Sequence, residues 1–171
     1  TTIHTLGEDD YLDYWADLRE NGLLVVDDWS TAYYGEFSGG SGSEGTHPLV
    51  VSYATSPAAE VYFSEGALEV PPTGAVTAPG TCFRQIEFVG VLQNGENPEL
   101  ARAFVEFALG ETFQEAIPLH MWVYPTHENA DLPQIFEDFA AQAEEPARLP
   151  VEMIEENRRD WIDAWTEVVL Q

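Results

Sequence analysis

Lysine is absent from this chain of 171 residues, and its six basic residues are all arginines. They stand against 31 acidic residues, so the formal net charge is -25. This balance argues against nucleic acid as a partner, because a negative surface repels phosphates. Acids spread over helix surfaces and loops are typical of proteins from salt-adapted microbes, and at molar salt a Debye length of about 3 Å leaves little long-range steering. Attraction of a cationic ligand by the acidic surface is the alternative.

Cysteine, metal-ligand spacings and long apolar runs are also scarce. Cys82 is the only cysteine, so it cannot form an internal disulfide and is expected to be a small buried hydrophobe. The four histidines show no metal-ligand spacing, which predicts surface or loop positions and no metal site. No apolar run reaches the roughly 20 residues that span a membrane. What the chain does have is 44% hydrophobic residues and five tryptophans, enough for a folded core in one or two domains.

Apolar periodicity divides the chain into helices and strands. In residues 8–21 apolar side chains recur at the i, i+3, i+4, i+7 spacing, and Gly22 ends the helix. The predicted helices are 8–21, 30–37, 56–64, 97–109, 112–116, 132–143 and 150–169. The predicted strands are 23–26, 49–53, 75–78 and 82–92. Between them the Gly-Ser run 38–45 is expected to be a flexible loop. The apolar stripes of the helices predict core positions for Trp15, Trp161 and Trp165.

The most informative stretch is residues 50–57, which read Val-Val-Ser-Tyr-Ala-Thr-Ser-Pro. The apolar run predicts a buried strand, Ser56 suits the N-cap of a helix, and Pro57 suits its first position. A strand that runs straight into a capped helix brings free backbone N–H groups to the carboxyl edge of a sheet, where small ligands settle in open α/β folds. Tyr53 would stand beside them as an aromatic wall. Thr55 and Ser56 add hydroxyl groups, whose alternative role is simply to cap the helix, worth about 1 kcal/mol.

Two further junctions carry aromatic side chains. Residues 24–33 read Leu-Val-Val-Asp-Asp-Trp-Ser-Thr-Ala-Tyr and place Trp29 before a Ser-capped helix. Residues 116–125 read Ala-Ile-Pro-Leu-His-Met-Trp-Val-Tyr-Pro, a Pro-flanked loop that carries Trp122. Three such junctions predict a pocket in which rings stack on a ligand. The alternatives are structural: Trp29 as a core indole beneath a helix, Tyr53 as a strand end, and Trp122 half-buried against the last helices.

Taken together, the three segments resemble the thiamine-binding proteins of ABC importers, a branch of the type 2 periplasmic solute-binding proteins. In that family a Trp-Ser-x-Ala-Tyr, a Ser-Tyr-x-Thr-Ser-Pro and an Ile-Pro…Trp-x-Tyr-Pro segment occur in this order. The resemblance covers nearly the whole chain but only about the second half of the family's length. It implies an α/β fold, the C-terminal portion of a two-lobed protein with mixed sheets flanked by helices. The implied divisions are the remainder of the second lobe (1–74), hinge-crossing strands with a first-lobe segment (75–125), and C-terminal packing helices (126–171).

The resemblance also implies a function of capture without chemistry, and therefore no enzyme activity and no cofactor. The chain would bind thiamine or a thiamine phosphate outside the cytoplasm, in the periplasm or at the cell surface, and deliver it to an ABC permease. Its other partner would be the upstream N-terminal half of the same protein, preceded by an export leader. The implied ligand-binding residues are Trp29, Tyr53, Ala54, Thr55, Ser56 and Trp122. Where the family often has an aromatic residue, this chain has Ala59, and Tyr62 one turn later is the candidate substitute.

Other ligands and functions stay open at this point. A related binding protein could carry iron, a polyamine or another organic cation, and Tyr33-Tyr34 is an adjacent tyrosine pair of the kind that iron capture uses. An enzyme for a thiamine precursor on the same fold would need a nucleophile or base in the cleft, which no motif supplies. A free-standing interaction domain is a third alternative. Asp27 and Asp28 could balance a thiazolium charge or be solvated loop acids.

Overall fold

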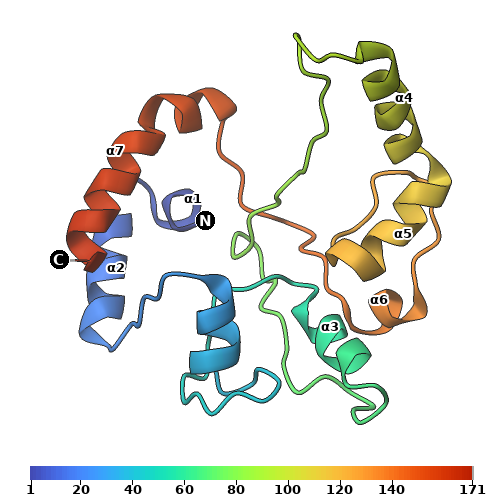
Figure 1. Cartoon of the computed structure of the whole chain (residues 1–171). Coiled ribbons are helices and arrows are strands. Elements are labelled where there is room, and N and C mark those ends of the chain that lie inside the picture. The colour runs from blue at the N-terminus through green and yellow to red at the C-terminus, as the bar shows by residue number, and fades with distance from the viewer. Residues whose placement is uncertain (171) are drawn as a thin grey trace. The chain divides into compact units, whose positions relative to one another are not determined.

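The computed structural model describes residues 1–170, which form two compact units (Figure 1). The first unit comprises Thr1–Ser52, Val76–Arg84 and the described chain from Gln142 onward. The second comprises Tyr53–Ala75 and Gln85–Ala141. Because the chain passes between them repeatedly, neither unit is a continuous piece of sequence. The predicted divisions at 74 and 125 stay a prediction for the longer protein.

The helices of the first unit are α1 (Thr2–Leu6), α2 (Tyr11–Glu20), η1 (Thr31–Glu36) and α7 (Val151–Leu170). α2 lies along α7, where the rings of Trp15 and Trp165 meet edge to face with centroids 5.5 Å apart (Figure 1). Both indoles, like that of Trp161, are half-buried and not fully inside the core as the apolar stripes predict. An indole N–H needs a hydrogen-bond partner, which keeps part of the ring near the surface. The N–H of Trp161 donates to the Glu8 carboxylate at 2.8 Å. The buried apolar side chains of this unit are Tyr11, Tyr33, Ala147 and Val169.

The Gly-Ser run 38–45 follows η1, a π-helix at the place of the predicted helix 30–37. The structure differs here from the flexible loop expected. A Cβ on Gly40 or on Gly45 would overlap the backbone of η1, so the run lies directly against the helix. After it, the N–H of His47 donates to the carbonyl of Glu36 at 3.0 Å. The glycines are therefore required for close packing around η1.

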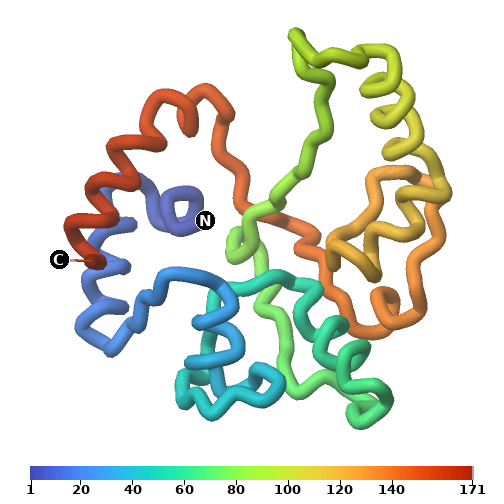
Figure 2. Tube along the Cα trace, viewed as in Figure 1, coloured from blue at the N-terminus to red at the C-terminus, as the bar shows by residue number. Residues whose placement is uncertain are grey.

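The helices of the second unit are α3 (Ser56–Phe63), α4 (Pro98–Leu109), α5 (Glu111–Met121) and α6 (Gln134–Phe139). α3 packs against α6, and α4 against α5 (Figure 2). α5 continues past its predicted end at 116 and makes helical part of the predicted Pro-flanked loop. Pro118 lies inside this helix with its ring fully buried, and the burial offsets the one hydrogen bond that a proline cannot donate. The buried apolar side chains of the unit include Ala58, Ala108, Pro118 and Phe136.

The predicted strands do not form sheets in the described chain. Within residues 1–170, β-pairing is limited to two isolated bridges, Phe37 with His47 and Phe83 with Ala147. The mixed sheets are therefore not confirmed in the described chain, because a sheet needs a neighbouring strand to accept and donate each backbone hydrogen bond. Val51 is 86% exposed, and so the apolar side chains that the pattern assigns to a buried strand lie uncovered.

Cys82 is half-buried, not a fully buried core residue as expected. Its thiol donates to the carbonyl of Val76 at 3.2 Å. In the described part of the chain, no three His, Cys, Asp or Glu side chains gather where they could hold a metal ion. Among the same residues, no helix combines the length and the apolar character that crossing a bilayer requires.

Candidate functional site

The backbone makes a sharp corner between Tyr53 and α3 in the second unit. The N–H of Ser56 donates to the carbonyl of Tyr53 at 3.0 Å and closes a turn. Thr55, not Ser56 as predicted, is the N-cap residue of α3, and Pro57 lies in the first turn. No side-chain oxygen caps this helix, because the Thr55 hydroxyl is engaged elsewhere.

That hydroxyl joins two of the segments singled out in the sequence. Thr55 is 6% exposed, and its Oγ1 donates to the carbonyl of Trp122 at 2.7 Å. Trp122 ends α5 in the left-handed region, with φ at 57°. A residue other than glycine adopts this conformation only where its surroundings hold it there. The second unit therefore brings the Thr-Ser-Pro corner and the Trp122 segment into direct contact.

Two backbone N–H groups at the corner, those of Ala54 and Thr55, have no acceptor within residues 1–170. Both residues are shielded from solvent, Thr55 almost completely and Ala54 in part. The carbonyl of Ala54 is occupied, since it accepts from the N–H of Ala141 at 3.1 Å. A shielded N–H without a partner is costly, and water or a ligand commonly supplies the missing acceptor. A hydroxyl or phosphate oxygen would suit these two donors.

An aromatic cluster surrounds Trp122. The ring of Phe136 stacks on the indole with centroids 5.6 Å apart and planes 17° apart. Tyr62 and Phe63 approach the same indole at 5.3 Å each. Tyr62 thus lies beside Trp122, although Ala59 stands where the family often has an aromatic residue. Trp122 is half-buried, as the structural alternative predicted, and Phe136 covers one of its faces.

Trp29 belongs to the first unit and is held from two sides. Its indole stacks on Tyr33, with centroids 4.9 Å apart and planes 22° apart. Its Nε1 donates to the Oγ of Ser52 at 3.0 Å. The indole is half-buried, so it is not the core residue that the structural alternative describes. Its orientation is fixed by the protein before any ligand arrives.

Asp28 caps the turn that starts next to Trp29. Its two carboxylate oxygens accept from the backbone N–H of Thr31 at 2.9 Å and from the Thr31 hydroxyl at 2.8 Å. These hydrogen bonds from Thr31 lower the pKa of the Asp28 carboxyl below its usual value. The side chain is thus engaged in local structure, which favours a capping role over charge balance for a ligand.

We expect this cap to be lost in acid. A carboxyl whose pKa is lowered by folding adds stability at neutral pH, and this contribution disappears as the pH falls below about 4. Urea unfolding of the protein and of Asp28→Asn would measure it. The stability difference between the two should be constant above about pH 5 and should shrink below about pH 4. A difference that does not change with pH would contradict the role.

The Tyr33-Tyr34 pair is not arranged for metal capture. Tyr33 is 2% exposed, and its ring lies between those of Trp29 and Phe37. Tyr34 meets Tyr33 edge to face with centroids 5.2 Å apart. Both tyrosines therefore pack against Trp29, and the buried Tyr33 is a poor candidate for an iron ligand.

The structure distributes the predicted site residues over both units. Trp29 is in the first unit, and the other predicted residues, Tyr53, Ala54, Thr55, Ser56 and Trp122, are in the second. Their convergence on one ligand stays a prediction. Sequence reasoning missed Ser52, which fixes Trp29, and Gln114, whose contacts are described below. Ser52 opens the Ser-Tyr-x-Thr-Ser-Pro motif, but the motif does not show that its hydroxyl meets Trp29. Gln114 lies in no motif, so no local signal identifies it.

The fold of this chain is similar to that of a solved binding protein. A solved structure called a periplasmic thiamin binding protein matches 98% of this chain and 49% of its own, with a TM-score of 0.68 and 25% identity. This likeness supports the binding-protein fold. No family model matches the chain.

Sequence relatives make the likeness more specific. The thiamine-binding periplasmic protein of Brucella suis biovar 1 (strain 1330) is 30% identical over 152 residues, which are 88% of this chain and 42% of that protein. The thiamine-binding periplasmic protein of Escherichia coli (strain K12) is 31% identical over 172 residues, 94% of this chain and 46% of that protein. The resemblance stated from the motifs is thus confirmed. The chain spans less than half the length of these curated relatives, which fits a portion of a longer protein.

Proposed function

We propose that this chain is the C-terminal portion of an extracytoplasmic solute-binding protein that captures thiamine or a thiamine phosphate and delivers it to an ABC permease. The observation that carries the proposal is the corner at Thr55. There one buried hydroxyl holds the Trp122 segment, while the N–H groups of Ala54 and Thr55 have no acceptor within residues 1–170. Likeness to relatives named for thiamine binding supports the choice of ligand.

The chemistry asked of the site is recognition only. The faces of Trp29, Tyr53 and Trp122 would stack on the two rings of thiamine, and attraction to the charged thiazolium would add about 0.5–2 kcal/mol. The N–H groups of Ala54 and Thr55, with the hydroxyl of Ser56, would take the hydroxyl or phosphate end. Closure of two lobes on the ligand shifts a population and lowers no reaction barrier, so neither catalysis nor a cofactor is involved.

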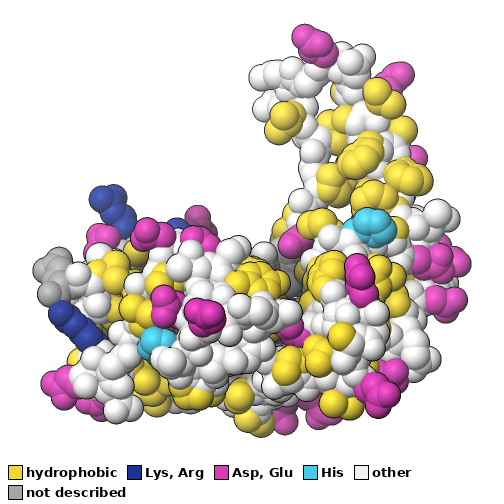
Figure 3. All heavy atoms as spheres, turned by 60° about the horizontal axis from the view of Figure 1, so that its bottom comes forward, with side chains coloured by type: hydrophobic (Ala, Val, Ile, Leu, Met, Phe, Trp, Pro, Cys, Tyr) yellow, Lys and Arg dark blue, Asp and Glu magenta, His cyan; other side chains and the backbone are white. Residues whose placement is uncertain are grey.

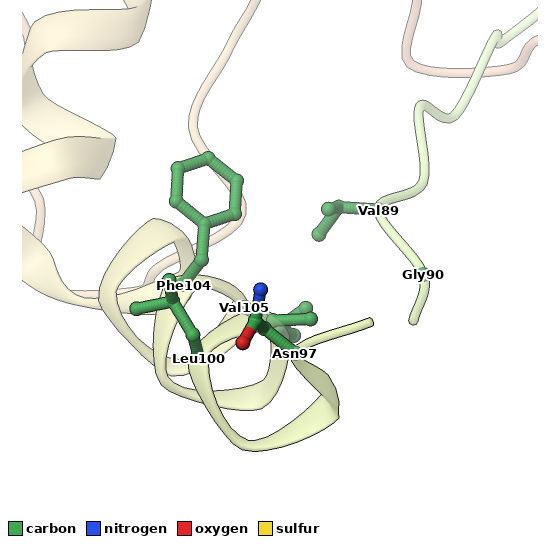
Figure 4. Close-up of a pocket in the computed structure, with 7 residues that line it drawn as sticks. Val89, Gly90, Asn97, Leu100, Phe104 and Val105 are labelled. Carbon is green, nitrogen blue, oxygen red and sulfur yellow. The ribbon is translucent and has the colours of Figure 1, made fainter. Parts of the chain in front are cut away.

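The rest of the site and of the sheets would come from the upstream half of the protein. An open apolar groove lies between the extended segment at Val89 and helix α4, and Val89 points toward the helix that carries Leu100 and Phe104 (Figure 4). Phe88 beside it is 89% exposed. Hydrophobic side chains gather over this part of the surface (Figure 3). Strands of the missing half would pair with the extended segments, cover these side chains and complete the mixed sheets, with 75–125 as the hinge-crossing part.

Titration of the full-length protein, followed by tryptophan fluorescence, tests the proposal. Thiamine and thiamine monophosphate should each give a saturable change in emission, because rings stacked on indoles alter their surroundings. Ferric iron and the polyamine spermidine serve as competing ligands and should give no saturable change. Saturation by either of these alone would show another cargo, and release of a cleaved pyrimidine, detected by mass spectrometry, would show an enzyme.

A further inference from the structure

Gln114 is a buried polar side chain with an unusual number of partners. It lies on α5, is 5% exposed, and uses both ends of its amide. Nε2 donates to the carbonyl of Ala108 at 2.7 Å. Oε1 accepts from the N–H of Thr126 at 2.7 Å, from the Thr126 hydroxyl at 3.1 Å and from the N–H of His127 at 3.4 Å. The amide therefore ties together three parts of the second unit.

Each of these contacts satisfies a group that has no partner in regular secondary structure. Ala108 is in the last turn of α4, where carbonyls have no intrahelical donor. Thr126 and His127 lie just after the Trp122 segment, in chain without regular pairing. A buried amide that is hydrogen-bonded at both ends in this way rigidifies what it joins. Gln114 thus anchors the far end of the stretch of chain from Trp122 to His127.

The near end of the same segment is anchored by Thr55. Its hydroxyl holds the carbonyl of Trp122, whose φ of 57° is disfavoured for a residue with a side chain. Such a conformation persists when the surroundings over-determine it. Thr55 at one end and Gln114 at the other thus hold the backbone from Trp122 to His127 by hydrogen bonds. The indole is held against Phe136 as a result.

We propose that Gln114 is a positioning residue for ligand binding: it does not touch the ligand, but fixes the segment that presents Trp122. The inference rests on the proposed function, because it assumes that Trp122 is a wall of the thiamine site. Without Gln114, the N–H groups of Thr126 and His127 lose their acceptor, and the segment gains alternative arrangements. Binding then has to order the indole again, and affinity falls.

Gln114→Met in the full-length protein tests the role, because methionine keeps the length of the side chain and removes all four hydrogen bonds. The matched control is Phe113→Leu. Phe113 is the neighbour of Gln114 on α5, and its ring meets the rings of Phe104 and Phe107 on α4. Both variants lose packing or hydrogen bonds between α4 and α5. Only Gln114→Met releases the chain after Trp122.

Two readouts are compared, thiamine affinity and the fluorine NMR spectrum of protein labelled with fluorotryptophan. The signal of Trp122 is the one absent from a Trp122→Phe sample. In Gln114→Met we expect this signal to split or broaden without ligand, and thiamine to bind about tenfold more weakly. In Phe113→Leu the signal stays single and affinity is retained. Thr126→Val, which removes only the hydroxyl that donates to Gln114, should shift the signal slightly and serves if Gln114→Met does not fold.

The outcomes separate the two proposals. If the unaltered protein binds thiamine and Gln114→Met binds no more weakly than Phe113→Leu, with an unchanged Trp122 signal, the positioning role is overturned and the proposed function stands. If Gln114→Met does not fold and Thr126→Val leaves the Trp122 signal unmoved, the role is overturned as well. If the unaltered protein does not bind thiamine, the proposed function fails in the first titration, and the positioning role fails with it.

Discussion

Trp29→Ala in the full-length protein should weaken thiamine binding about 30- to 1,000-fold, a loss of about 2–4 kcal/mol typical of an aromatic anchor. The ring that is lost is oriented in advance. Tyr33 stacks on one face of the indole, and Ser52 accepts its N–H at 3.0 Å. A ligand ring that stacks on a preset indole pays little to order it. Isothermal titration calorimetry with thiamine measures the effect.

Two substitutions to phenylalanine separate the ring from its orientation. Trp29→Phe keeps an aromatic face but loses the hydrogen bond to Ser52, so its affinity should lie between those of the native protein and Trp29→Ala. Trp161→Phe is the matched control. It also removes a half-buried indole with a hydrogen-bonded N–H from the first unit. Affinity should be unchanged there. Equal losses in both variants would mean that Trp29 acts through stability and not through the ligand.

The helices of this protein could be predicted well because their signals are local. The predicted helix 56–64 is α3 (Ser56–Phe63), and the predicted helix 150–169 is α7 (Val151–Leu170). Periodic apolar residues and the Pro and Gly at helix ends are sufficient for this. The end of α5 was predicted too early because Pro118 normally breaks a helix, and only its burial against other residues makes it tolerable.

The sheets could not be predicted in the same way. An alternating or apolar run indicates an extended segment, and the segments at Val51 and Phe88 lie outside the helices. Whether such a segment becomes a strand depends on a partner that is distant in sequence. Here the matching solved structure is about twice as long as this chain, and in residues 1–170 pairing stops at isolated bridges.

The candidate site shows the same difference between local and long-range signals. Motifs were sufficient to find Trp29, Tyr53 and Trp122 as candidates. They could not show that the hydroxyl of Thr55 reaches the Trp122 carbonyl across 67 positions of sequence, or that Gln114 anchors the chain beyond it. Hydrogen bonds of this kind depend on tertiary packing and leave no spacing in the sequence. The residues that present the rings were predictable, and the residues that position them were not.

Gly45→Ala should destabilise the first unit by about 3–5 kcal/mol, the range typical of severe backbone or core defects. The new Cβ would overlap the carbonyl and Cα of Glu36 at the end of η1, and backbone atoms cannot move aside as a flexible side chain can. The run 38–45 would have to leave η1. Tyr33 on that helix stacks on Trp29, so the substitution should also disturb the orientation of the Trp29 indole. Urea unfolding of the full-length protein measures the stability.

Gly35→Ala is the matched control, because the same change is made on η1 itself. A Cβ there meets only the methyl group of Thr31 at 4.0 Å, an ordinary contact. Alanine also restricts the unfolded chain more than glycine does, so this variant should be unchanged or more stable by up to about 1 kcal/mol. If Gly45→Ala unfolds at the same urea concentration as Gly35→Ala, the run does not lie against η1 in solution. The orientation of Trp29 would then need another support.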